Sequence, residues 1–128
     1  MQYIENIQTL MHECPQVHVI ISSVLPRAGE NKEIVNSQIN SFNQMLEEIA
    51  DEEINLHFCK NDVYFEQEEG VIRFLYQDSD TFGMHVNIEG KERLSASITA
   101  VIKEMYFKEK FFECSEKICN YIVQEPLI

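Results

Sequence analysis

The residues best suited to chemistry stand at the ends of two segments of the chain. His85 follows Gly83 in a polar loop that should lie at the carboxyl edge of a parallel sheet, where ligands bind in open α/β folds. Ser22 and Ser23 end a predicted strand at that same edge. A serine hydroxyl, a histidine base and a carboxylate that orients the histidine are the set required for nucleophilic hydrolysis of an ester. These residue types therefore permit acyl-transfer chemistry.

Each of these residues also has a plainer structural interpretation. His85 can tie its loop to the helix that follows, and Ser22 and Ser23 can cap backbone groups at a strand end. The segment Ser-Ser-Val-Leu-Pro also lacks the small residues of a strained nucleophile elbow. Asp80 is a candidate to orient His85, but an acid in a Gln-Asp-Ser-Asp loop is more often only solvated. The base is therefore better supported than the nucleophile.

The remaining histidines and cysteines do not favour a metal centre. The conceivable ligands lie close together in sequence: His57 with Cys59, and His12 with Cys14 and His18. Structural zinc sites usually join two Cys or Cys/His pairs with two to four residues between the partners, and Cys114–Cys119 is the only Cys pair in the chain with that spacing. Cys114 and Cys119 point about 140° apart on a helix, so they form neither a chelate nor a disulfide. We expect no metal and no cofactor.

The elements that position these residues form a strand, helix, strand unit. Val17–Val24 is a near-continuous β-branched run, which is typical of a strand buried on both faces in a parallel sheet. Asn31 can cap a helix whose apolar residues recur at helical spacing up to about Ala50. Ile54–Cys59 alternates in the manner of a second strand. Together the three segments predict a right-handed βαβ unit.

Weaker patterns flank this unit. Tyr3–His12 has the apolar spacing of a short amphipathic helix. The stretch 60–86 is irregular, and a connection of this length is usually functional or contains small elements of its own. Asn87 can cap a further helix, and a last helical stretch is expected around Phe111–Val123. The predicted order is helix, strand, helix, strand, long connection and two helices.

Length and charge limit the possible classes of protein. The chain has 128 residues, which suits one domain, and its 22 acidic and 10 basic residues give a net charge of −12. Binding to nucleic-acid phosphates or to an anionic membrane requires clustered Lys and Arg, so neither is expected as a partner. The charge favours a neutral or cationic substrate or a basic protein, although solubility alone can explain it.

The cellular setting follows from what the sequence lacks. No apolar run approaches the roughly 20 residues of a membrane span, and the first residues have no signal or transit pattern. We therefore expect a cytoplasmic protein with four reduced cysteines that act as small buried hydrophobic residues.

Two segments carry a resemblance to a known family. One is Val19–Arg27, a strand that ends in a Ser-rich turn before Pro-Arg, followed by a long helix. The other is Phe74–Gly90, which contains the pattern Gly-x-His-x-Asn-x-x-Gly. Together they resemble the C-terminal half of the SGNH/GDSL hydrolase family, and the match runs from about Tyr3 to Ile102. The resemblance implies a three-layer α/β/α fold, flavodoxin-like with a short parallel sheet, and hydrolysis of carboxylic esters or acetyl groups.

The resemblance also implies roles for individual residues. His85 takes the place of the catalytic base of the family. The Asp that the family has three residues before this His is replaced by Phe82, so either Asp80 or Asp78 would have to orient His85. Candidates to line a substrate pocket are Ser22, Ser23 and Asn87.

The departures from the family are as informative as the match. The nucleophilic Ser and the oxyanion-hole Gly and Asn of the family lie in earlier blocks that have no counterpart in this sequence. We therefore expect residues 1–128 to form a single SGNH-hydrolase-like domain without the N-terminal strands of the family. It would be a truncated or split ester hydrolase, inactive on its own and thus a pseudoenzyme. The alternative is a non-catalytic acidic module that binds a protein or forms a homo-oligomeric scaffold.

One further expectation concerns assembly. In the family the Val17–Val24 strand is flanked by strands that come earlier in the chain, so one edge of an apolar strand would be unpaired here. Such an edge promotes association unless it is covered. We expect a homodimer or a partner chain that supplies strands. Any self-association should strengthen as salt rises, because salt screens the repulsion between negatively charged copies.

Overall fold

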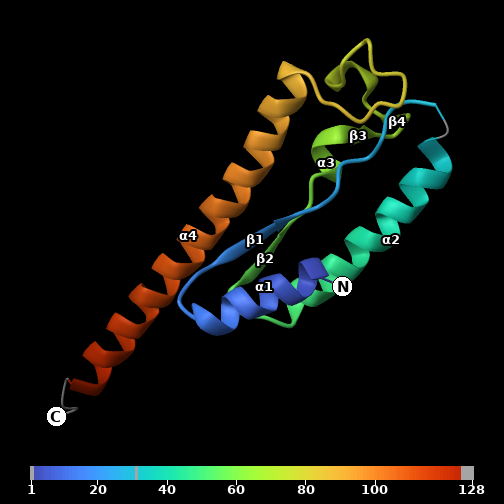
Figure 1. The fold of residues 1–128 in the computed structure, drawn as a ribbon. Helices are drawn as coiled ribbons and strands as arrows, with labels where there is room; N and C mark the ends of the chain where they lie inside the picture. Colours follow the sequence, from blue (N-terminus) through green and yellow to red (C-terminus); the bar gives the residue numbers. More distant parts are fainter. Residues whose placement is uncertain (1, 31, 125–128) are drawn as a thin grey trace.

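A pair of parallel strands with helices on both faces forms the centre of the protein (Figure 1). The computed structural model describes residues 2–30 and 32–124, and side chains up to residue 110. In chain order the elements are α1 (Gln2–Glu13), β1 (Val19–Ser22), α2 (Lys32–Asp51), β2 (Leu56–Cys59), α3 (Asp62–Phe65), β3 (Glu66–Gln67), β4 (Gly70–Val71), the 3-10 turn η1 (Arg73–Leu75) and α4 (Ile88–Gln124). This order and the short parallel sheet confirm the predicted partial α/β fold class.

The two strands are shorter than the sequence predicts. β1 and β2 pair in parallel over four residues each, with Val19 opposite Leu56. β1 ends early because the backbone N–H and C=O of Val24 bind the side-chain amide of Asn43 on α2, at 2.8 and 2.9 Å, instead of a neighbouring strand. The prediction that β1 is buried on both faces is also wrong, since Ile21 is the fully buried residue of β1 and Ser22 is exposed.

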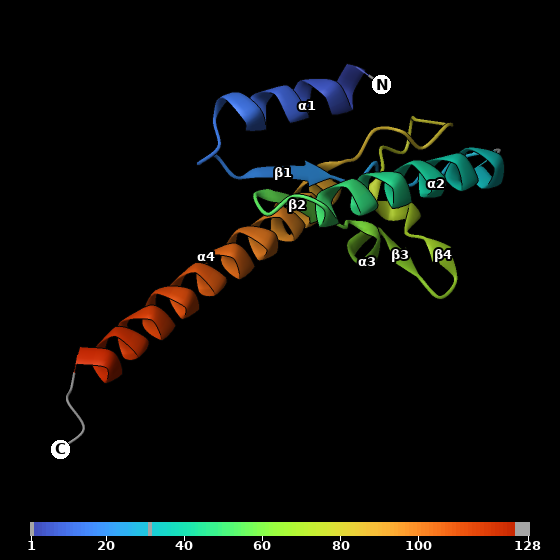
Figure 2. The same cartoon turned by 90° about the horizontal axis from the view of Figure 1, so that it is seen from below.

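The main apolar core lies on one face of this sheet. Its buried centre consists of Ile21, Leu46, Ala50 and Leu56. Helix α1 packs against this centre through Ile4, Ile7 and Met11, so the predicted amphipathic helix is confirmed. Helix α4 packs on β2 from the opposite face, and Figure 2 shows the strands between α1 and α4. The burial of each large aliphatic side chain of this core, such as Ile21 or Leu46, contributes roughly 1.5–3 kcal/mol to the stability of the fold.

The irregular stretch 60–86 contains small elements of its own, as the sequence predicts. Its own core of Phe65, Ile72, Leu75 and Tyr76 is buried. The Tyr76 ring packs edge-on against Phe65, with 6.2 Å between centroids, and its hydroxyl donates to the carbonyl oxygen of Pro26. Burial raises the pKa of the Tyr76 hydroxyl, which therefore stays protonated. This hydrogen bond joins the stretch to the segment that follows β1.

Helix α4 is one continuous helix of 37 residues, not the two helices that the sequence predicts. The predicted cap is confirmed, because Asn87 Oδ1 accepts from the backbone N–H of Gly90 at 2.9 Å. No Gly or Pro occurs between residues 91 and 124, so nothing in the sequence breaks the helix. Its C-terminal part extends beyond the rest of the protein (Figures 1 and 2). None of the helices described is both long and apolar enough to cross a membrane.

The structure describes only some of the residues behind the predicted helix cap and the predicted cysteine states. The expected cap Asn31 lies outside the described residues. Cys14 and Cys59 are free thiols, partly and fully buried, as expected of reduced cysteines. The side chains of Cys114 and Cys119 lie outside the described part.

A histidine pair joins the amino-terminal ends of the two strands. His18 Nδ1 lies 2.9 Å from His57 Nε2, and the ring centroids are 5.2 Å apart. A separation this large at that N···N distance means that the two nitrogens point almost directly at each other, so one ring can donate its N–H to the other. The pKa of His57 is lowered, first by partial burial and then by His18 and Lys108, whereas Glu104 acts in the opposite direction.

We predict that the protein loses stability as the pH falls below 6.5, the ordinary pKa of histidine. Because the folded pKa of His57 lies below 6.5, the unfolded chain binds this proton more readily, and stability is lost between 6.5 and the folded pKa. Urea unfolding above and below pH 6.5 should show a weaker pH dependence in His57→Gln. The exposed His12→Gln serves as control, and an unchanged pH dependence in His57→Gln would contradict the assignment.

Candidate functional site

The loop of residues 77–85, which carries Asp80 and His85, is held closed at its base. An antiparallel bridge joins Tyr76 to Val86 on either side of it. The guanidinium of Arg73 donates to the carbonyl oxygen of Asp80 at 2.9 Å. The loop is therefore fixed by backbone contacts from residues close in sequence.

A tight backbone contact also fixes the loop against the segment that follows β1. The backbone N–H of Ala28 donates to the carbonyl oxygen of Gly83 at 3.2 Å. A Cβ atom on Gly29 would lie 2.1 Å from the carbonyl oxygen of Thr81, and Gly83 has a φ of +62°. Gly29 is required because the two backbones approach closely. Gly83 is required for the same reason and also for its positive φ. The loop therefore packs against residues 28–30, which follow the end of β1 by six to eight residues.

Asp80 is the carboxylate that orients His85. Its carboxylate accepts from the backbone N–H groups of Phe82, Met84 and His85, at 3.2, 2.8 and 2.7 Å, and lies 2.9 Å from His85 Nδ1. The backbone N–H of His85 is the main cause that lowers the pKa of Asp80 to about 2, against a smaller opposing effect of burial. The turn from 80 to 85 therefore brings Asp80 to the imidazole. Phe82, which stands three residues before His85, is 59% exposed.

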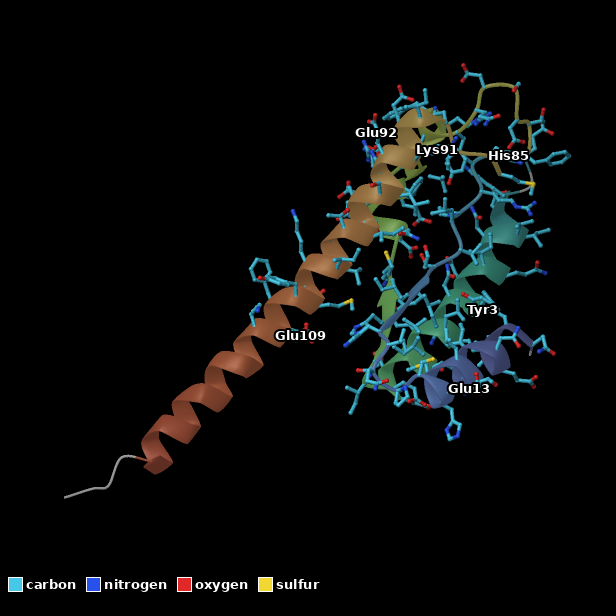
Figure 3. The ribbon with its side chains drawn as sticks, turned by 60° about the vertical axis from the view of Figure 1, so that its left-hand side comes forward. Tyr3, Glu13, His85, Lys91, Glu92 and Glu109 are labelled. Carbon is cyan, nitrogen blue, oxygen red and sulfur yellow. The ribbon has the colours of Figure 1, made fainter. Side chains whose placement is uncertain are left out.

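His85 has the geometry of a general base. Because Nδ1 faces the Asp80 carboxylate, the hydrogen-bond network assigns the proton to Nδ1, and Nε2 keeps its lone pair. The side chain is 68% exposed, and Figure 3 shows it at the outer surface of its loop. Across the described ranges, its ring bonds to Asp80 and to no serine, threonine or cysteine. The loop thus holds an imidazole paired with a carboxylate, and in the described part of the chain no nucleophile is hydrogen-bonded to that imidazole.

Ser22 and Ser23 are held by Asn61, which lies two residues after the end of β2. Ser23 is buried, and its hydroxyl accepts from the backbone N–H of Asn61 at 3.0 Å. The hydroxyl of the exposed Ser22 accepts from Asn61 Nδ2 at 2.8 Å, and the same Nδ2 donates to the carbonyl oxygen of Ser23 at 3.0 Å. The structure therefore uses the two serines to join the carboxyl ends of the strands.

Asn61 also connects the sheet to α4, a role that the sequence prediction missed. It is fully buried, and its Oδ1 accepts from the Ser97 hydroxyl at 2.7 Å and lies 3.4 Å from Cys59 Sγ. Cys59 Sγ lies 3.2 Å from the Ser97 oxygen. The available signal was an amide side chain two residues after the last apolar residue of a predicted strand, where polar partners are needed.

Asn87, the third pocket candidate, is occupied in holding the backbone. Its amide nitrogen donates to the carbonyl oxygens of Phe74 and Tyr76, and its oxygen caps α4. Within residues 2–30 and 32–110, no three His, Cys, Asp or Glu side chains are arranged to hold a metal ion.

Comparisons with known proteins give a structural relative. No family model and no curated protein matches the chain. A solved structure of a protein from Streptococcus pneumonia, provisionally named a platelet activating factor, is similar with a TM-score of 0.60 and 25% sequence identity. The match covers 73% of this chain and 45% of that protein, so this chain spans less than half of its length. The likeness confirms an α/β fold.

We predict that the Asp80 carboxyl titrates near its lowered pKa of about 2. Because the main cause is a backbone N–H, His85→Ala should leave the pKa of Asp80 below 3.8, its ordinary value, although higher than in the unchanged protein. The measurement is an NMR titration of the side-chain carboxyl carbon. A value of 3.8 in His85→Ala would show instead that the imidazole controls this pKa.

We predict that Asn61→Ala lowers the free energy of unfolding by about 3 kcal/mol, because it leaves buried hydrogen-bonding groups without partners. The exposed Asn40→Ala on α2 is the matched control and should change stability by less than about 0.5 kcal/mol. Both values come from urea unfolding. Equal losses of unfolding free energy in the two variants would show that the buried hydrogen bonds of Asn61 do not stabilise the fold.

Proposed function

We propose that this chain is the acid–base part of an SGNH-like ester hydrolase and is inactive until another segment or chain supplies the nucleophile. The Asp80–His85 pair carries the proposal. The carboxylate fixes the tautomer of the imidazole, and Nε2 is open to solvent. This is the arrangement of base and orienting acid in hydrolases that use a serine nucleophile.

The chemistry assigns a separate task to each residue. Nε2 of His85 would take the proton of an incoming hydroxyl as that oxygen attacks the ester carbonyl, and would then return it to the leaving alcohol. Asp80 would stabilise the imidazolium formed between these two steps. Hydrogen-bond donors for the developing oxyanion must come from the same source as the nucleophile.

The surroundings of the pair suit a neutral, partly apolar ester. Phe82 and Met84 are neighbours of His85 in the loop and are 59% and 48% exposed. The net charge of −12 disfavours an anionic substrate. The relative from Streptococcus pneumonia, whose name refers to platelet activating factor, supports a hydrolase-like domain of this type.

A second candidate function is a non-catalytic interaction module. It is favoured by the ring of His85, which meets no nucleophile in the described part of the chain, and by the acidic surface. On this interpretation Asp80 and His85 serve only to stiffen the loop.

We predict that the chain alone does not hydrolyse a short-chain chromogenic ester, and that a chimera does. In the chimera this chain replaces its matched part of the Streptococcus protein, whose remaining sequence stays in place. His85→Ala should lower the rate of the chimera at least about a hundredfold, since that is the usual contribution of a general base. The unchanged Streptococcus protein, measured on the same ester, gives the reference rate.

The controls separate the two candidate functions. His12→Ala removes an exposed histidine with no role in the site and should leave the rate of the chimera unchanged. A chimera that folds by circular dichroism but is inactive would support the interaction module. Ester hydrolysis by the chain alone that depends on His85 would show that no second source of residues is needed.

A further inference from the structure

The two outer edges of the sheet differ in chemical character. The outer edge of β2 borders a cavity of about 400 Å³ between α2 and α4. Charged side chains surround this cavity: Glu47, Asp51, Lys60, Glu104 and Lys108. Charges beside an unpaired edge oppose the addition of another strand. The β2 edge is therefore protected.

The outer edge of β1 has no such protection. The backbone N–H groups of Val19 and Ser23 donate to β2, so the alternate residues Ile20 and Ser22 direct their backbone groups away from it. Nothing in the described ranges hydrogen-bonds to these outward backbone groups. The segment from Val17 to Pro26 contains no Asp, Glu, Lys or Arg. We call this the free edge of β1.

Helix α1 extends over the space beside the free edge. Figure 2 shows α1 on the β1 side of the strand pair, away from β2. Its inner residues join the main core, whereas Tyr3 and Leu10, seven positions apart, are 49% and 45% exposed. Residues seven apart lie on the same side of a helix. A strand added to the free edge would therefore find apolar side chains above it.

We propose that the free edge of β1 binds an extended apolar segment of a separate polypeptide as a third strand beneath α1. Backbone hydrogen bonds to Ile20 and Ser22 would give affinity, and the contact with Tyr3 and Leu10 would select apolar side chains. The net charge of −12 favours a segment with basic flanking residues.

The geometry argues against a second copy of the chain as the occupant. Two identical strands paired antiparallel are related by an axis perpendicular to the sheet, which keeps both α1 helices on the same face. Both helices would then lie over the same two strands and compete for one space. Two copies would also bring together chains that each carry a net charge of −12.

The proposed strand also reaches the candidate site. A strand added parallel to β1 would end at the same edge of the sheet as Ser22, from which the chain continues to Ala28 and its contact with the loop that holds His85. If the proposed function holds, this is the direction from which the nucleophile arrives. Strand binding itself does not depend on that function.

The test uses the purified chain and the synthetic peptide Lys-Val-Thr-Val-Thr-Val-Lys. Binding should slow hydrogen exchange at the amides of Ile20 and Ser22 about tenfold or more, and leave Leu46 in α2 unchanged. Ile20→Pro removes a single outward N–H, which an edge strand tolerates, and should weaken peptide binding at least about tenfold. Ile20→Val keeps the N–H and is the matched control.

Three outcomes would overturn the proposal that a separate polypeptide adds a strand at the free edge of β1. Equal effects from a peptide with N-methyl groups on alternate residues, or no slowing at Ile20 and Ser22, would exclude strand addition. A chain that forms dimers by itself, and loses them in Ile20→Pro, would make a second copy the occupant. Peptide binding together with an inactive chimera would reject only the proposed function.

Discussion

This small fold depends on the hydrogen bonds of the buried Asn61 side chain. A sheet of two strands is marginal, because each strand has a neighbour on one side alone. Here one side-chain amide bonds to Ser22 at the end of β1, to Cys59 at the end of β2 and to Ser97 on α4. Every buried side-chain nitrogen and oxygen in the described part has a partner, so the polar connection adds order without leaving unpaired groups. Apolar packing on the opposite face then completes the sandwich.

The candidate site is stable for a different reason. Asp80 and His85 are held by residues within one loop, by the Tyr76–Val86 bridge at its base and by the contact of two glycine backbones. None of these interactions requires further strands in the sheet. The Asp80–His85 pair can therefore keep its geometry in a chain that matches less than half of its structural relative. The geometry of the Asp80–His85 pair depends on residues of its own loop, whereas a complete hydrolytic site would need residues from elsewhere.

The order of the main elements could be predicted from the sequence, because it follows from the spacing of apolar residues. The strand lengths could not, since β1 ends where Asn43, nineteen residues away in sequence, binds Val24. The choice of Asp80 over Asp78 depends on a turn that brings three backbone N–H groups to one carboxylate. Asn61 was missed because its partners come from three separate elements. The cap Asn87 could be predicted, because its role depends on neighbouring residues alone.

The length of α4 affects how the molecule moves through solution. A helix of 37 residues is about 55 Å long, whereas a compact chain of 128 residues has a radius of gyration of about 14 Å. Because part of the helix extends beyond the body, frictional drag should exceed that of a sphere of the same mass. A monomer would elute early in gel filtration, at a volume expected of a larger particle. Tumbling should also be slower about the axes perpendicular to the helix than about the helix axis.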